Sequence, residues 1–247
     1  MKKYIVLIGL CYAISASAQI KDAESLIRKM HKKYHGNFNR DITFVQLNED
    51  YDENGKVIKH STSFETFHYP GKFRNDIGPL VNKDGYIIIN DSIYLFKNGK
   101  VYEKRYTQYD VGLLTGDLYF MKIDDALNEL KRHGYNLSVF REDMWRGKPV
   151  YVVGAQKGDE RSPQFWIDQE ELYIVRDINF SVEENKLQDI RFLEHAKVEK
   201  AWVEERIEIY VNGKLVRKEH YAEVKANSDL DLKIFDPNAI GKVHWRK

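Results

Sequence analysis

Apolar residues recur at helical spacing near the start of the chain. Five of them fall on one face of a helix when they are read at 3.6 residues per turn. Asp22 precedes this stripe and can cap a helix start, and Gly36 follows it and suits a helix end. The pattern predicts an amphipathic helix whose apolar stripe consists of Ala23, Leu26, Ile27, Met30 and Tyr34.

Strand patterns dominate after this helix. Residues 42–47 and 57–69 are rich in aromatic and β-branched residues, and a turn at 52–55 separates them. Asn-Gly pairs, which favour tight hairpin turns, stand between β-rich runs at 54–55, 98–99 and 212–213. Further turn sequences at 83–85, 146–148 and 183–186 extend the pattern. The chain is therefore expected to form a meander of antiparallel strands.

The middle of the chain interrupts the strands. Residues 109–118 are expected to form a short helix, and residues 124–133 a second one, with Asp124 as its cap and Gly134 after its end. Strands then resume over 135–224. No linker rich in Pro, Gly or Ser divides these parts, so residues 19–247 are interpreted as a single domain.

The late strands alternate between apolar and polar positions. Ile207, Ile209 and Val211 are expected on one face, and Glu208, Tyr210 and Asn212 on the other. A one-sided antiparallel sheet must cover its apolar face, and three helices give thin cover. The predicted fold is mainly β with α (α+β), a curved, half-open antiparallel β-barrel covered by the N-terminal helix and the central helical insert. Such a shape can enclose a hollow.

The first residues carry an export signal. A basic head, an apolar run over 4–14 and small residues at 16–18 match a secretory signal peptide, so residues 1–18 are expected to be cleaved. The expected location is the periplasm. The single cysteine, Cys11, could instead mark a lipid anchor, but Leu10 precedes it and cleavage there would truncate the apolar run. We therefore favour a soluble exported protein without disulfides.

Charge and motifs exclude several function classes. The chain has 39 Lys and Arg against 38 Asp and Glu, so it lacks the excess of positive charge that attracts a polyanion. No nucleic-acid partner is therefore expected. His31 and His35 have the spacing of zinc ligands on a helix, but lysines lie between them, and a solvated helix face is the preferred interpretation. No Gly-x-Ser-x-Gly elbow or phosphate-binding loop occurs. We expect no enzyme, no metal and no cofactor.

Several short sequence segments, taken in order, resemble those of the periplasmic outer-membrane lipoprotein carrier and lipoprotein-sorting superfamily. They follow the opening helix and extend over nearly the whole chain after residue 18. They are 42–46 (ITFVQ), 69–74 (YPGKFR), 82–85 (NKDG) with 93–96 (IYLF), 164–168 (QFWID) with 172–176 (LYIVR), and 231–237 (DLKIFDP). The resemblance implies a half-open barrel that holds acyl chains or other apolar ligands between its sheet and its helices.

The resemblance also implies partners and site residues. The expected ligand is an acyl chain or a lipidated protein, with lipoprotein sorting to the outer membrane as the process, envelope membrane proteins as further partners and a monomer as the working form. The carriers hold their moving helix with an arginine before the proline of the strand break, where this chain has Tyr69. The expected cavity or lid residues are Phe44, Phe64, Phe67, His68, Tyr69, Phe73, Tyr94, Phe96 and Trp166.

Two alternatives remain open from the sequence. Aromatic residues on strands can line a lipid cavity, but they also form ordinary solid cores. A filled core would favour a protein-interaction or sensor module on the same fold. An internal hollow smaller than roughly 300 Å³ would support that second interpretation.

Overall fold

A computed structural model describes residues 20–246. The expected signal peptide at 1–18 lies outside the described residues. The helices are α1 (Ala23–Tyr34), α2 (Asp110–Thr115) and α3 (Ile123–Arg132), with single 3₁₀ turns η1 (Leu80–Asn82), η2 (Asp117–Tyr119) and η3 (Leu232–Phe235). The strands are β1 (Asp41–Tyr51), β2 (Val57–His68), β3 (Lys72–Ile77), β4 (Gly85–Ile89), β5 (Ser92–Lys97), β6 (Lys100–Tyr106), β7 (Phe140–Trp145), β8 (Lys148–Val153), β9 (Gln164–Asp168), β10 (Ile174–Ser181), β11 (Lys186–Val198), β12 (Ala201–Val211) and β13 (Lys214–Ala226).

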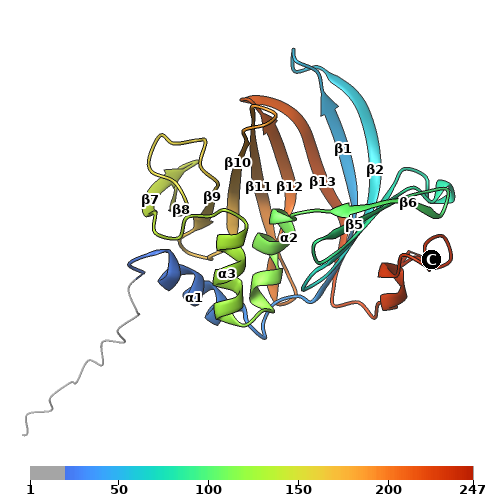
Figure 1. The fold of residues 1–247 in the computed structure, drawn as a ribbon, viewed down its shortest axis with the longest axis horizontal. Helices are drawn as coiled ribbons and strands as arrows, with labels where there is room; N and C mark the ends of the chain where they lie inside the picture. The colour runs from blue at the N-terminus through green and yellow to red at the C-terminus, as the bar shows by residue number, and fades with distance from the viewer. Residues whose placement is uncertain (1–19, 247) are drawn as a thin grey trace, which may run out of the picture.

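All thirteen strands form one antiparallel sheet. Its order is β6-β5-β4-β3-β2-β1-β13-β12-β11-β10-β9-β8-β7, so pairing of β1 with β13 joins an early meander to a late one. The sheet is not closed, because β6 and β7 lie at opposite edges. It curves around α1, α2 and α3, which lie together on its concave side, while long strands extend beyond them (Figure 1). This architecture confirms the predicted half-open barrel with helical cover.

The Asn-Gly pairs form the expected hairpin turns. Asn98 and Gly99 join β5 to β6, and Asn212 and Gly213 join β12 to β13. Both residues of each pair have positive φ, between 49° and 77°. Two consecutive positive φ values define the type I′ turn, whose twist matches that of the flanking strands. The local sequence therefore sets the register of these two hairpins.

The helices begin and end close to the predicted positions. Asp22 caps α1 and accepts a hydrogen bond from the Ser25 backbone N–H at 2.7 Å, and all five residues of the predicted stripe are buried. The predicted cap of α3 is wrong, because that helix begins at Ile123 and Asp124 lies inside its first turn. A carboxylate in the first turn still stabilises the helix through its dipole.

The main hydrophobic core lies between the concave face of the sheet and the helices. Ile207 belongs to this core and Ile209 packs against it, as the predicted alternation requires, whereas Glu208 hydrogen-bonds Tyr210 on the other face. The convex face carries two smaller clusters. In one of them, Ile234, Phe235 and Ile240 of the C-terminal segment cover Ile87 and Phe96 of the sheet. The other consists of Val150, Val152, Trp166 and Val175.

Within residues 20–246, no helix combines the length and the apolar character that crossing a bilayer requires.

Candidate functional site

Two hollows open on the concave side of the sheet. The first, the mouth hollow, has a volume of about 200 Å³ and lies between the α2–α3 insert and strands β2–β4. Its lining is Phe67, Pro70, Gly71, Lys72, Phe73, Ile88, Asn90, Asp91, Tyr109, Gly112, Leu113, Asp117, Met121, Glu129 and His133. Apolar side chains from the sheet and the insert therefore meet in it, beside a set of charged groups.

The second, the inner hollow, has a volume of about 300 Å³ and lies along the concave face of β1, β2, β3 and β11–β13. Its lining is Gln46, Asn48, Lys59, Ser61, Ser63, Glu65, Phe67, Phe73, Asn75, Ile77, Tyr86, Tyr109, Val111, Ile190, Ile207, Ile209, Arg217, Glu219 and Tyr221. Nine of these nineteen side chains are polar or charged, which differs from the apolar hollow that the resemblance implies.

Three aromatic rings belong to the linings of both hollows. Phe67 lies 4.5 Å from Phe73 between ring centroids, and Phe73 lies 5.3 Å from Tyr109. Tyr109 comes from the start of the helical insert, whereas the two phenylalanines come from the sheet. Because the three rings line both spaces, they form a partition whose third member belongs to the insert.

Two buried carboxyl groups face the inner hollow. Glu65 is 4% exposed and accepts a hydrogen bond at 2.5 Å from Asn75 Nδ2. Burial raises the pKa of Glu65 well above its ordinary value, and the nearby charge of Glu219 adds to this rise. Burial also raises the pKa of Glu219 to about 7, although Arg217 opposes the rise. Both groups therefore favour their protonated form in the folded protein.

Arg217 gives these carboxyl groups little compensation. Its Nε donates to Asp50 Oδ1 at 2.7 Å, whereas its Nη1 lies 3.9 Å from Glu219 Oε1. Hydrogen bonds of ordinary length join donor and acceptor at about 2.9 Å, so the contact with Glu219 is a longer-range attraction. The strongest partner of Arg217 is thus Asp50, and Glu219 is left without a close cation.

The helical insert is tied to the strand break at Tyr69 and Pro70 by specific contacts. The Tyr69 hydroxyl lies 3.2 Å from Thr115 Oγ1, and the Gly71 N–H donates to Asp117 Oδ1 at 2.8 Å. Burial raises the pKa of Asp117 to about 7. The break itself was predicted, since proline cannot donate to the sheet ladder.

An arginine also reaches this break, from a position that the sequence comparison did not single out. Arg40 Nη1 donates to the Tyr69 carbonyl at 2.9 Å, and its guanidinium lies 4.5 Å from the centroid of the Phe120 ring. It thus contacts both the strand break and the insert. Tyr69 carries no positive charge, but Arg40 brings one to its backbone carbonyl.

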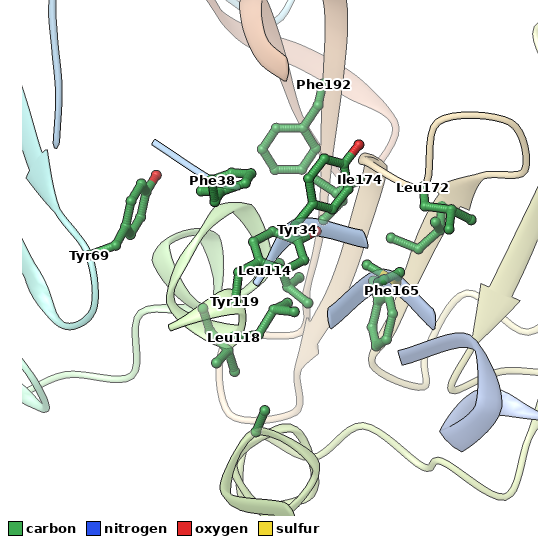
Figure 2. Packing of buried hydrophobic residues seen from close by; sticks show 14 of the residues in the cluster. Tyr34, Phe38, Tyr69, Leu114, Leu118, Tyr119, Phe165, Leu172, Ile174 and Phe192 are labelled. Carbon is green, nitrogen blue, oxygen red and sulfur yellow. The ribbon is translucent and has the colours of Figure 1, made fainter. Parts of the chain in front are cut away.

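Aromatic side chains fill the space where α1 and the insert meet the sheet. Phe38 lies 4.6 Å from Tyr119 and 6.0 Å from Tyr69 between ring centroids, and Tyr34 lies 5.0 Å from Tyr119. These rings belong to one core cluster with Leu114, Leu118 and Phe165, all of which are labelled in Figure 2. This end of the concave side is densely packed, and the space left among Tyr34, Phe38 and Tyr119 is only about 10 Å³.

The nine residues predicted for the cavity or lid are divided between the two faces of the sheet. Phe67 and Phe73 line both hollows, Tyr69 contacts the insert, and Phe44 is buried against Tyr221 at 4.0 Å. The other five lie away from the hollows. Phe96 and Trp166 belong to the clusters on the convex face. The His68 side chain is hydrogen-bonded to Asp41, with 2.5 Å between Nδ1 and Oδ1. The ring of Phe64 lies beside Arg246, and that of Tyr94 lies beneath Lys104.

The helical histidine pair has a packing role in this structure. His31 Nε2 lies 2.9 Å from the carbonyl oxygen of Met121, and His35 Nδ1 lies 2.9 Å from that of Tyr119. Both rings thus join α1 to the end of η2. Across residues 20–246, no group of three or more His, Cys, Asp or Glu side chains is arranged to hold a metal ion.

Comparison with known proteins finds solved structures with a similar fold but low sequence identity. No protein-family model matches the chain, and no curated protein matches it. A LolA superfamily protein from Nitrosomonas europaea is 13% identical with a TM-score of 0.57, and the alignment covers 87% of this chain and 98% of that one.

Two further solved structures are similar. A domain described as outer membrane lipoprotein-sorting from Vibrio parahaemolyticus is 9% identical with a TM-score of 0.58, over 88% of this chain and 97% of that one. A DUF1329 family protein from Desulfovibrio piger is 15% identical with a TM-score of 0.51, over 88% and 97%. The chain therefore shares its fold with a LolA superfamily structure and with a lipoprotein-sorting domain, as the sequence resemblance predicted.

Proposed function

We propose that this protein is an exported, periplasmic binding protein that holds the apolar chain of a lipid or lipidated protein in its mouth hollow. The observation that supports this most is the composition of that hollow. Phe67, Phe73 and Ile88 approach it from the sheet, and Leu113 and Met121 approach it from the insert. Apolar burial against these side chains would drive binding. A carrier role in lipoprotein sorting follows as the finer form of the proposal.

The attachment of the insert supports entry of a ligand from this side. Tyr69 contacts Thr115 by a single hydroxyl contact, and Gly71 contacts Asp117 by a single hydrogen bond. Each such bond contributes only about 1 kcal/mol to stability. Movement of the insert would also expose the buried Leu113, Leu114 and Leu118, so a longer chain would enter only where its own apolar surface replaces that packing.

A second candidate is a protein-interaction or sensor module. The solid aromatic core shown in Figure 2 favours it, because the helices already bury much of the concave face. The small volume of the mouth hollow, about 200 Å³, favours it as well. In this case a protein partner would bind the sheet edge or the exposed side of the insert, and no acyl chain would enter.

Ligand extraction distinguishes the two candidates. Delipidated protein would be incubated with envelope lipids and acylated peptides, repurified, and analysed by mass spectrometry for bound species. We expect an enriched lipid or acylated peptide at a stoichiometry near one. An established lipoprotein carrier treated in parallel is the positive control. If the control captures a ligand and this protein captures none, the binding proposal is rejected in favour of the interaction module.

Filling the mouth hollow should abolish uptake. Met121 is only half-buried and lines the mouth hollow, so Met121→Trp adds volume there without burying a charge. We expect at least a tenfold loss of fluorescent fatty-acid binding, with a melting temperature within a few degrees of the parent protein. Met144→Trp is the matched control, because Met144 is 59% exposed on β7 and lines neither hollow. Equal binding by both variants would place the acyl site elsewhere.

A further inference from the structure

Unsatisfied hydrogen-bond acceptors gather in the inner hollow. Asn75 is 6% exposed, and its Nδ2 donates to Glu65, which leaves its Oδ1 as a buried atom without a hydrogen-bond partner. Among residues 20–246, Glu219 has no charged partner closer than the guanidinium of Arg217 at 3.9 Å. An unpaired buried acceptor is costly, so a ligand that donates hydrogen bonds would be stabilised here.

The charges around these acceptors favour a cationic donor. Arg217 is held by Asp50, and Lys59 is exposed at the edge of the hollow, so neither closely neutralises Glu65. Tyr86 and Tyr221 add aromatic surface to the same lining, and aromatic faces attract cations. An ammonium group is compact, positively charged and carries three donors and no acceptor, which complements such a set.

We propose that the inner hollow binds a primary ammonium group, held by the carboxyl groups of Glu65 and Glu219 and the side-chain oxygen of Asn75. This deepens the proposed function, on which it rests for the wider ligand, because it assigns a polar head beside the site for an apolar chain. The partition of Phe67, Phe73 and Tyr109 separates the two parts. A volume of about 300 Å³ is ample for an ammonium group with a few carbons.

Proton release would accompany binding. Both carboxyl groups favour their protonated form in the free protein, because burial raises their pKa values. A bound ammonium stabilises the carboxylate instead, so binding at pH 6 should release roughly one proton. Uptake of a neutral alcohol supplies no charge to stabilise the carboxylate and should release none.

The test compares butylammonium with 1-butanol by isothermal titration calorimetry, in two buffers of different ionisation enthalpy. We expect butylammonium to bind at least tenfold more tightly than butanol, with proton release. Glu65→Gln and Glu219→Gln should each weaken butylammonium binding at least tenfold. Glu223→Gln is the matched control, since Glu223 lies on the same strand as Glu219 but outside the inner hollow, where it pairs with Arg246.

Two further arms identify the source of the ammonium group. One compares vesicles of phosphatidylethanolamine with vesicles of phosphatidylcholine, whose trimethylated nitrogen has no N–H to donate. The other compares a lysine-containing peptide with its acetyl-lysine form. Binding confined to the first member of either pair supports the inference and names a lipid or a peptide as the source.

Several results would overturn the inference. Equal affinity for butanol and butylammonium would show that charge is not recognised, and unchanged binding by Glu65→Gln would show that the site is elsewhere. If the glutamine variants fail to fold, the butanol comparison and the proton release of the parent protein still decide. A protein that binds butylammonium but captures no acyl chain would contradict the proposed function and keep this inference.

Discussion

Gly116→Ala should lower the free energy of unfolding by about 3 kcal/mol, as overpacking of a rigid core does. A Cβ at this position would lie 2.3 Å from both Cε1 and Cζ of Tyr69. The Tyr69 ring is 2% exposed and packs against Phe38, Phe67 and Phe120, so it has no room to move. The φ of Gly116 is −160°, outside the left-handed region that favours glycine, so the clash with Tyr69 is the cause.

A double-mutant cycle on urea unfolding checks this prediction. Tyr69→Ala removes the ring, so adding Gly116→Ala in that background should cost less than about 1 kcal/mol. Tyr69→Phe keeps the clashing atoms and should leave the full cost in place, which makes it the matched control. Equal costs of Gly116→Ala in the parent and Tyr69→Ala backgrounds would show that the insert does not pack on this ring.

Local signals in the sequence predict most of the fold. The stripe from Ala23 to Tyr34 predicts α1, because an amphipathic helix must bury its apolar face and the structure buries all five of its apolar positions. The Asn-Gly pairs at 98–99 and 212–213 predict hairpins because few other dipeptides accept two positive φ values. The long-range pairing of β1 with β13 has no such local signal, and the sequence did not predict it.

The site was harder to predict, because alternation along a strand does not say which face is concave. In β2, Ser61, Ser63 and Glu65 alternate with half-buried residues, and such a polar row normally faces solvent. Here it faces the inner hollow, whereas Phe64 points to the convex side, near the C-terminal segment. The prediction therefore included aromatic residues from both faces of the sheet. Only residues on the concave face can line the hollow.

Arg40 illustrates a second limit. Its contact with the Tyr69 carbonyl joins residues 29 positions apart, and it depends on how β1 enters the sheet. Sequence comparison of the strand break finds Tyr69 there and no cation. Only the assembled sheet places Arg40 between that break and Phe120 of the insert.

Glu219→Gln should stabilise the protein at pH 8 but not at pH 4.5. Burial raises the pKa of Glu219 from its ordinary value near 4.5 to about 7. The stability that the protonated carboxyl provides is full below pH 4.5 and is lost as the pH rises through 7. At about 1.4 kcal/mol for each pH unit, ionising this group costs the parent protein about 3 kcal/mol by pH 8. Glutamine keeps the shape of the protonated acid and avoids that cost.

Urea unfolding of both proteins at the two pH values provides the measurement. Other groups titrate in the same range, since burial also raises the pKa values of Glu204 and Asp117 to about 7 and lowers that of His195 to about 4. Asp117 and His195 contribute equally to both proteins and cancel in the difference between variant and parent. Glu204 and Glu65 interact with the charge of Glu219, so the difference reports Glu219 together with its coupling to these two groups. The charged groups that face Glu219 are Arg217, Asp50, Glu65 and Glu204, and the substitution leaves each in place.

The sign of the difference decides whether the inner hollow is built as described. Glu223→Gln, outside the hollow, should show no comparable gain at pH 8. A gain for Glu219→Gln confined to high pH would mean that the fold keeps a buried acid at an energetic cost, as a site for a cation would require. If the variant is less stable than the parent at pH 8, the Glu219 carboxylate is well solvated or paired with Arg217. In that case ionising Glu219 carries no energetic cost, and the inner hollow holds no unfilled site for a cation.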